Sequence, residues 1–495
     1  MTPFSSRVTR YALRLLPFLP LLAACAVGPD FVRPEPPKGA GYLSRPLPTE
    51  TAVAAGARQT FRPEGEVVAR WWRKFGTAKL DAVVDEALAG NQDLQAARAR
   101  LRQSRELLIA GSGIFFPQID GSAGFTRQKF SAARFGGGFR SSIFNLYSAS
   151  LGATYDLPLF GRSRRQVEGL QAQADYQRYE EKAAWLTLIG NVVNTAMAWS
   201  GYRAQIEALE QIVAFERRQL KIVEAKRRAG LVAETDVLSL RSQLAASEAR
   251  VPPLRQSRDR ARHLLASLVG RSPGAWAAPE LALDNFVLPS DLPLTLPSTL
   301  VRRRPDILAA EAQLHSASAD IGVATANLFP SISLSATYGQ ENTRFSDLFK
   351  GMSSFWNWGG SLTQPLFHGG SLWHRRKAAI AAYDAALADY RQTVLTAFAQ
   401  VADALRALEH DAETLKAQAA ALDNAERNLA LLQNQYQAGI ASYLQVLDAD
   451  RQYQQARIGV IQAKTRRLQD TAVFLQALGG GWWQPPDGDK DKPGV

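Results

Sequence analysis

The fold of this chain follows from residues 371–438, which read SLWHRRKAAIAAYDAALADYRQTVLTAFAQVADALRALEHDAETLKAQAAALDNAERNLALLQNQYQA. These 68 residues contain neither Pro nor Gly, and an apolar side chain recurs in them at every seventh position. The apolar column consists of Ile380, Leu387, Val394, Val401, Leu408, Leu415, Leu422 and Leu429, and Tyr436 continues it. A sustained period of seven is typical of an α-helix that supercoils against neighbouring helices. At 1.5 Å per residue, this helix should be about 100 Å long.

A second stretch of the same length repeats this pattern. Residues 162–229 also lack Pro, and their apolar column matches the first one with a shift of 209 positions. It consists of Trp185, Val192, Trp199, Ile206, Val213 and Leu220. The chain is therefore an internal duplication, and the repeat favours one elongated body of two halves over separate globular domains.

Each half is expected to run helix, strand, strand, long helix and return helix. Gly230 and Gly439 follow the long helices and should end them. The other elements are expected at about 78–111 and 305–327 for the first helices, within 117–158 and 330–366 for the strands, and at about 234–269 and up to 478 for the return helices.

Composition sets the remaining boundaries. We expect a leader at 1–24, a lipidated, extended and unpaired arm at 25–76, the first repeat at 77–270, an irregular equatorial linker at 271–297, the second repeat at 298–480 and a polar tail at 481–495. Trp71 and Trp72, near the end of the arm, are expected to pack in the core.

The single cysteine, Cys25, excludes an intramolecular disulfide and follows a short secretory leader. Arg7, Arg10 and Arg14 precede an apolar stretch that is too short to span a bilayer. The sequence Leu22-Ala-Ala-Cys25 then resembles a bacterial lipobox, in which the cysteine thiol carries a diacylglycerol and the new amine is acylated. An ordinary leader with a chance cysteine is the alternative. Position and context favour lipid attachment at Cys25.

The expected strands have one apolar and one polar face. Apolar and polar residues alternate within 147–157, 331–338 and 356–366. Alternating segments of about ten residues with Tyr and Trp near their ends are typical of outer-membrane barrels, although a soluble sandwich also alternates. Four strands cannot close a barrel in lipid, and the smallest such barrels have about eight strands. Three copies would give a barrel of about 12 strands, and the strand count alone also allows a dimer.

The charge distribution argues against nucleic acid as a partner. The chain has a net charge of +12, but Lys and Arg are spread along the helices among Gln, Glu and Asp, which favours solvated helical faces. The five histidines lack zinc-ligand spacing, and the sequence contains no phosphate-binding loop, nucleophile elbow or dinucleotide motif. We therefore predict no catalytic residue, no metal ligand and no cofactor.

Several short stretches together resemble one family. They are Cys25-Ala-Val-Gly-Pro-Asp-Phe31, Arg303-Arg-Pro-Asp-Ile307, Ile321-Gly-Val-Ala324 with Leu328-Phe-Pro-Ser-Ile332, Gln364-Pro-Leu-Phe367, and Ala438-Gly-Ile-Ala-Ser-Tyr-Leu444 with Val446-Leu-Asp448. Through them the chain resembles the outer membrane factor family, the TolC-like efflux channels, and within it the lipoprotein branch. The resemblance covers nearly the whole chain after the leader.

The resemblance implies an α+β membrane protein that assembles as a homotrimer. A transmembrane β-barrel would lie in the outer membrane of a Gram-negative bacterium, and a long α-helical barrel would extend into the periplasm. A periplasmic membrane-fusion adaptor would connect it to an inner-membrane pump, usually a proton-driven resistance-nodulation-division transporter. The protein itself would be a passive conduit for drugs or other toxic small molecules, and no enzyme.

Similarity to the family places Tyr436, Leu444 and Asp448 at a periplasmic aperture. Leu444 and Asp448 are four residues apart and therefore share a helix face. Three copies of Asp448 would form a carboxylate ring, which favours cations in pores. Helix-pair packing is the alternative for Tyr436 and Leu444, and a solvated carboxylate is the alternative for Asp448.

The two helical tips provide further candidate sites. Arg227 corresponds to Tyr436 in the first half, and Arg227 and Asp236 are candidates for a latch. The tips at Gly230, Gly439 and Ala441 are expected to contact the adaptor.

Other functions stay open at this point. Within the same class, the channel could serve type I secretion or metal efflux. A structural lipoprotein would use the same helices as spacers and would not conduct. A lipoprotein enzyme acting on the cell wall would need paired carboxylates in a cleft, and none stand out in the sequence.

Overall fold

The computed structural model describes residues 26–35, 41–63, 65–130 and 142–483. They form two compact units, and each unit draws on both halves of the chain. Of the described residues, the first unit takes 26–33, 102–130, 142–176 and 310–390, and the second takes 34–35, 41–63, 65–101, 177–309 and 391–483. The predicted leader, Cys25 and most of the polar tail lie outside the described residues.

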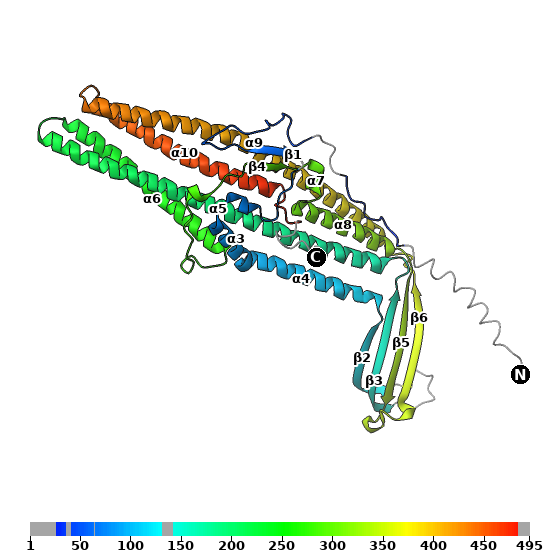
Figure 1. The fold of residues 1–495 in the computed structure, drawn as a ribbon. Helices are drawn as coiled ribbons and strands as arrows, with labels where there is room; N and C mark the ends of the chain where they lie inside the picture. Colours follow the sequence, from blue (N-terminus) through cyan, green and yellow to red (C-terminus); the bar gives the residue numbers. More distant parts are fainter. Residues whose placement is uncertain (1–25, 36–40, 64, 131–141, 484–495) are drawn as a thin grey trace, which may run out of the picture. The chain divides into compact units, whose positions relative to one another are not determined.

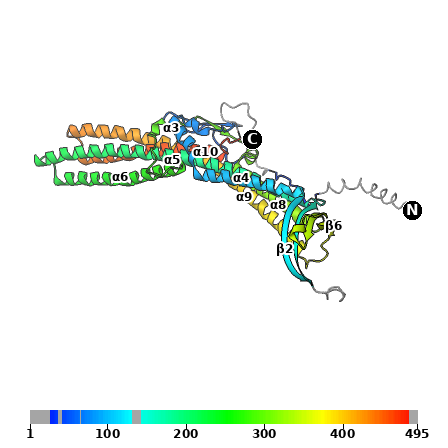
Figure 2. The same ribbon diagram turned by 90° about the horizontal axis from the view of Figure 1, so that it is seen from below.

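The long helices agree with the sequence prediction. Helices α5 (Arg162–Arg228) and α9 (Ser371–Gln437) each contain 67 residues and begin at the predicted positions. Gly230 and Gly439 follow them with φ values of +72° and +74°, which glycine adopts readily after a helix end. The return helices are α6 (Glu234–Leu268) and α10 (Tyr443–Ala477), and in the second unit they run back along the long helices (Figures 1 and 2).

The seven-residue column is the buried stripe of each long helix. In α9, Val394, Val401, Leu408, Leu415 and Leu429 are 9% exposed or less. The corresponding residues of α5, from Val192 to Val213, are also buried. The predicted period is therefore confirmed as a packing surface over 192–213 and 394–415, whereas Ile380, Leu387 and Leu422 are only half-buried. Among the described residues, no helix carries an apolar run sufficient to cross a lipid bilayer.

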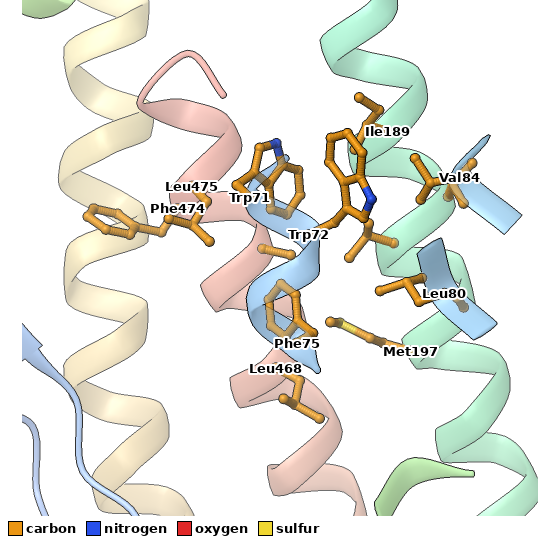
Figure 3. Packing of buried hydrophobic residues seen from close by; sticks show 14 of the residues in the cluster. Trp71, Trp72, Phe75, Leu80, Val84, Ile189, Met197, Leu468, Phe474 and Leu475 are labelled. Carbon is orange, nitrogen blue, oxygen red and sulfur yellow. The ribbon is translucent and has the colours of Figure 1, made fainter. Parts of the chain in front are cut away.

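A short 3-10 helix, Trp71–Phe75, fills the core of the second unit. Trp71, Trp72 and Phe75 are 2% exposed or less and pack between α5 and α10 (Figure 3). The ring of Trp72 lies 6.2 Å from that of Trp185 on α5, in an edge-to-face arrangement that aromatic pairs prefer. The expectation that the two tryptophans are core residues is confirmed.

Two expectations about the less regular segments are wrong. Strand β1 (Thr60–Pro63) of the arm pairs in parallel with strand β4 (Asp291–Leu294) of the linker, so the arm is not unpaired and the linker is not wholly irregular. Proline is tolerated here because each strand of a two-stranded sheet has one free edge. The linker is followed by α7 (Pro297–Val301).

The first helix of the first half is interrupted, which the sequence did not predict. Helices α3 (Ala78–Gly90) and α4 (Gln92–Ser112) are separated by Asn91, whose backbone is extended. Asn91 Oδ1 accepts a hydrogen bond from Leu94 N at 2.9 Å, and Asn91 Nδ2 donates one to Leu268 O at 2.9 Å. A Cβ atom on Gly90 would lie 2.4 Å from Val269 O, so only glycine allows this approach. The equivalent helix of the second half, α8 (Pro305–Ala326), is continuous.

The sheet of the first unit contains four antiparallel strands in the order β2-β3-β5-β6 (Figures 1 and 2). Their bounds are Gln118–Phe130, Ser142–Leu157, Ser331–Asn342 and Ser354–Thr363. One row across the sheet reads Ile119, Ala153, Ala336 and Trp358, and the next row reads Gln118, Thr154, Ser335 and Gly359. Residues directly opposite each other share a face, so the register separates an apolar face from a polar one and confirms the predicted alternation.

Replacing Leu408 by Ala should lower the free energy of unfolding by about 2–5 kcal/mol, because a fully buried leucine leaves a cavity when it is truncated. Leu431→Ala on the same helix is the matched control, since Leu431 is 61% exposed. Denaturant unfolding of the purified chain in detergent measures both changes. Equal losses in the two variants would contradict the assignment of the column to the core.

Candidate aperture, membrane sheet and anchor

The tips of the two helical hairpins expose apolar side chains. Leu231 and Ile440 directly follow Gly230 and Gly439, and their exposed fractions are 73% and 77%. They occupy equivalent positions in the two repeats. Behind the second tip, Ser442 begins α10 with a capping box in which Gln445 Oε1 accepts a hydrogen bond from Ser442 N at 2.8 Å. The caps fix the start of each return helix, so Leu231 and Ile440 stay in the exposed turns that precede these helices.

Leu444 and Asp448 lie together on the exposed side of α10. Leu444 is 67% exposed, and Asp448 is also exposed. Asp448 accepts hydrogen bonds from Arg451 at 2.5 Å and from Gln452 at 2.8 Å, both on the same helix. Within one chain, therefore, Leu444 does not take part in the packing between helices, and Asp448 is a solvated carboxylate with local partners.

Tyr436 has a different environment, because it links three helices of the second unit. Lys226 Nζ on α5 donates a hydrogen bond to Tyr436 Oη at 3.1 Å and lies 4.8 Å from the centre of its ring. The ring of Tyr443 on α10 lies 5.4 Å from that of Tyr436. Cation–π and aromatic contacts of this kind stabilise by about 0.5–1.5 kcal/mol each. The sequence analysis did not identify Lys226.

The two latch candidates make separate contacts within the first hairpin. Arg227 forms an ion pair with Glu234, the first residue of α6. Asp236 Oδ2 accepts a hydrogen bond from the backbone nitrogen of Ala233 at 3.3 Å and so caps the same helix. Both contacts hold the α5–α6 turn in shape.

The sheet of the first unit exposes its apolar face. The larger side chains on that face include Ile119, Tyr338, Trp356, Trp358 and Leu362, whose exposed fractions range from 57% to 78%. On the polar face, Ser122 and Ser150 share a hydrogen bond of 2.8 Å, and so do Ser333 and Ser361. An exposed apolar surface of this kind on an isolated chain marks a region that is covered by lipid or by another protein.

The segment that follows Cys25 is fixed to the first unit by its backbone. Val27 N donates a hydrogen bond to Phe160 O at 3.2 Å. A Cβ atom on Gly161 would lie 2.5 Å from Ala26 Cα, and one on Gly28 would lie 2.6 Å from Gly322 Cα. Gly28 and Gly322 belong to two of the stretches that carry the family resemblance, so the structure explains why glycine stands at both positions.

A buried arginine adds ionic contacts to the same segment. Arg165 on α5 is 4% exposed, and its guanidinium donates to Asp30 Oδ1 at 2.6 Å and to Glu168 Oε2 at 2.7 Å. Glu168 Oε1 in turn lies 2.9 Å from His315 Nε2 on α8, and the ring of His315 stacks on Phe31 at 4.3 Å. This network was not visible in the sequence, because its members are up to 285 positions apart.

The comparisons with known proteins agree with this geometry. Residues 83–271 and 296–480 match the model of the family described as "Outer membrane efflux protein". The chain belongs to the outer membrane efflux protein family. As a member of this family, it is a channel protein of efflux systems, and its place is in the outer membrane.

Individual relatives support the same assignment over nearly the whole length. The chain is 30% identical to the pyoverdine export outer membrane protein OpmQ of Pseudomonas aeruginosa, with coverage of 89% of this chain and 94% of the relative. It is 31% identical to the outer membrane protein OprJ of the same species, over 93% of this chain and 94% of the relative. The solved structure of the outer-membrane channel OprN has a TM-score of 0.84 at 30% identity and covers 93% of this chain and 100% of that structure.

The matching family is described as an efflux protein family, and OprN is described as an outer-membrane channel. The part of the chain that the structure describes contains no cluster of three or more His, Cys, Asp or Glu residues able to hold a metal ion.

Replacing Arg165 by Met should loosen the arm segment 26–33, because Asp30 would lose its partner. Since the Asp30 side chain is 91% exposed, solvent screens this pair, and we expect a loss of about 0.5–1 kcal/mol. Amide exchange of residues 27–33 should accelerate by roughly two- to fivefold. Hydrogen exchange with mass spectrometry measures the change. Arg164→Met, an exposed neighbour, is the control. Identical exchange in the two variants would mean that Arg165 does not hold the arm.

Proposed function

We propose that the chain forms the outer-membrane channel of a tripartite efflux system as a homotrimer. In this assembly a periplasmic adaptor connects it to an inner-membrane pump, which supplies the energy. The channel is a passive conduit and carries out no chemical reaction. The observation that carries the proposal is the combination, in one chain, of a two-faced sheet with free edges and long helical hairpins with exposed apolar tips.

The sheet supports a closed assembly of several copies. Strands β2 and β6 are the edges of the four-stranded sheet. In lipid, the unpaired backbone groups of such an edge cost several kcal/mol each, so strands that span the membrane close into a barrel. If β6 of one copy pairs with β2 of the next, three copies close a barrel of about 12 strands, which exceeds the minimum of about eight. The apolar face then contacts lipid and the polar face lines the channel.

The hairpin tips are the proposed docking sites for the adaptor. The exposed residues Leu231 and Ile440 would provide the apolar contacts, and Gly230, Gly439 and Ala441 would allow a close approach. Three copies present six tips of two kinds. The exposure of equivalent residues in both repeats supports a partner that contacts both kinds.

Tyr436, Leu444 and Asp448 are the proposed aperture. The outward position of Leu444 and Asp448 leaves both side chains available to a central pore. Tyr436 would set the closed state through its contacts with Lys226 on the other hairpin, and Arg227 and Asp236 would act as a latch by shaping the first tip. Asp448 would then form a carboxylate ring in the trimer.

Cys25 is the proposed site of the lipid anchor. The anchoring of residues 26–33 to α5 and α8 supports this assignment, because it holds the start of the described chain beside Phe160 and Gly161, directly after β3. Two or more acyl chains on one residue would give stable attachment to the outer membrane.

The proposed cargo consists of small molecules delivered by the pump, which is assigned to the resistance-nodulation-division class. Relatives of this chain are named for the export of pyoverdine and of toluene, two compounds of very different chemistry. This spread supports a channel that does not itself select among small molecules, with selection made by the pump.

A crosslinking experiment in cells tests the tripartite assembly. With Cys25 acylated, Ala441→Cys supplies the only free thiol, and a photo-crosslinker attached there should trap a periplasmic adaptor identifiable by mass spectrometry. Lys416→Cys, an exposed position in the middle of α9, is the control and should trap much less. Absence of an adaptor at position 441, in cells where the protein is abundant and trimeric, would favour a spacer role and contradict the aperture assignment.

Replacing Asp448 by Ala should lower the cation-to-anion permeability ratio at least about twofold and raise the leak through the closed channel, because the ring loses three carboxylates. Planar bilayer recordings of the purified protein measure both quantities. Asp423→Ala is the control, since Asp423 is an exposed carboxylate of α9 that pairs with Arg427 at 3.0 Å. Unchanged selectivity and leak in the Asp448 variant would remove Asp448 from the aperture.

A further inference from the structure

Two buried carboxylates lie between helices of the second unit, close to the proposed aperture. Glu216 of α5 is 1% exposed, and Asp450 of α10 is 6% exposed. Gln454 Nε2 contacts both groups, donating to Glu216 Oε1 at 3.2 Å and to Asp450 Oδ2. One amide group therefore links the two carboxylates in the protein interior.

Helix α6 completes the surroundings of the pair. Gln243 Nε2 and Ser247 Oγ also donate to Glu216 Oε1, at 3.2 and 3.0 Å. Glu216 Oε1 therefore accepts hydrogen bonds from α6 and from α10. Glu216 Oε2 is buried as well, and no described residue forms a hydrogen bond with it. This oxygen can accept one more proton donor.

The groups around the pair are acidic or neutral. Burial and, second, the negative charge of Glu216 raise the pKa of Asp450 to about 6, against the opposing effect of the hydrogen bond from Gln454. Tyr443 of α10 lies near both carboxylates, and Tyr436 of α9 and Asp236 of α6 lie near Tyr443. A cation of this region, Lys226 of α5, donates to Tyr436 Oη at 3.1 Å.

Two arginines of α5 and α6 form ion pairs with other carboxylates. Arg217 pairs with Glu248 at 2.7 Å, and Arg241 pairs with Glu224 at 2.7 Å, and both arginine side chains are more than half exposed. No Lys or Arg among the described residues contributes to the shifted pKa of Asp450. A proton is therefore the species that can relieve the repulsion between the two carboxylates.

We propose that Glu216 and Asp450 form a proton-binding site that controls how tightly α10 is held against α5 and α6. With a proton from solvent on Asp450, only one negative charge remains, and Gln454 joins the two side chains and hence the helices. Without it, two like charges repel each other in a medium of low dielectric constant. Asp450 lies two residues after Asp448 on the helix that also carries Leu444. The protonation state of Asp450 would therefore affect the positions of Leu444 and Asp448. This last step rests on the proposed aperture, whereas the proton site itself does not.

The direction of the pH dependence follows from the raised pKa. A carboxyl group whose pKa is higher in the folded protein favours the folded contact when it is protonated. The contribution is complete below the ordinary value of 3.8 and is lost as the pH rises through about 6. A pKa difference of one corresponds to a factor of ten in an equilibrium constant. The equilibrium constant for forming the contact therefore falls by as much as about 100-fold over this pH range.

Hydrogen exchange of the full-length protein tests the proton site. Asp450→Asn removes the charge and should keep the helices joined at every pH. At pH 4, close to the ordinary pKa of 3.8, segments 216–236 and 436–454 should exchange at rates that agree within about threefold in the wild type and in this variant. At pH 7.5 they should exchange about 10- to 100-fold faster in the wild type. The comparison is made at each pH separately, so the intrinsic pH dependence of exchange cancels. A constant ratio from pH 4 to 8 would overturn the proposal.

Two further variants sharpen this test. Glu216→Gln removes the other charge and should also abolish the pH dependence, which keeps the test valid if Asp450→Asn folds poorly. Glu248→Gln removes an exposed carboxylate beside Ser247 and should follow the wild type. A pH dependence that persists in Glu216→Gln would overturn the proposal, because the two carboxylates would not be coupled.

Bilayer conductance distinguishes the proton site from the aperture. The closed-state leak of the wild type should rise severalfold between pH 5 and 7.5, and that of Asp450→Asn should stay at the low value. A pH-dependent exchange ratio together with a pH-independent leak would retain the proton site and overturn its link to Leu444 and Asp448. Failure of the adaptor crosslink at Ala441 would bear on the tripartite assembly and leave the exchange result intact.

Discussion

A helix of 67 residues has to be covered along its whole length, and this requirement shapes the second unit of the protein. Isolated helices in water are marginal, so α5 and α9 depend on burial of one apolar stripe. The column through Val401 and Leu408 belongs to the same cluster as Trp71 and Trp72. The return helices, the aromatic residues of the arm and the linker all contact this cluster. Both repeats therefore contribute to this one cluster of the second unit, and smaller clusters follow the helices toward the tips.

The regular elements could be predicted because their signals are local. The seven-residue period identified both long helices, and alternation identified the sheet. The break at Asn91 could not be predicted in this way. It is imposed by the approach of Gly90 to Val269, which lies far away in the sequence. The pairing of β1 with β4 was missed for a similar reason, since a proline-rich composition predicts an extended backbone but does not identify its hydrogen-bonding partner.

The candidate sites likewise contain some residues that local sequence signals identified and others that they did not. Leu444 and Asp448 share an exposed helix face, as their spacing indicated, whereas Lys226 and Arg165 acquire their roles only through contacts with distant segments. The buried carboxylates could have been identified from their spacing to the seven-residue apolar columns. Glu216 follows Val213 by three positions, and Asp411 follows Leu408 by three, which places an acid beside the core stripe. Both carboxylates are buried, and burial with the neighbouring Asp470 raises the pKa of Asp411 to about 7.

Ala26, which directly follows Cys25, lies against Gly161, and this close approach has a consequence for the order of biogenesis. A Cβ atom on Gly161 would lie 2.5 Å from Ala26 Cα, so the proposed lipid on Cys25 would be tethered by a single residue, whose reach is about 3.6 Å. Such a tether would leave the acyl chains no freedom to enter a bilayer at a distance from the sheet. On this proposal, residues 26–33 would dock only once the lipid and the strands had reached the same membrane. Docking of the arm would then be a late step of assembly, which takes place only after the protein has reached the outer membrane.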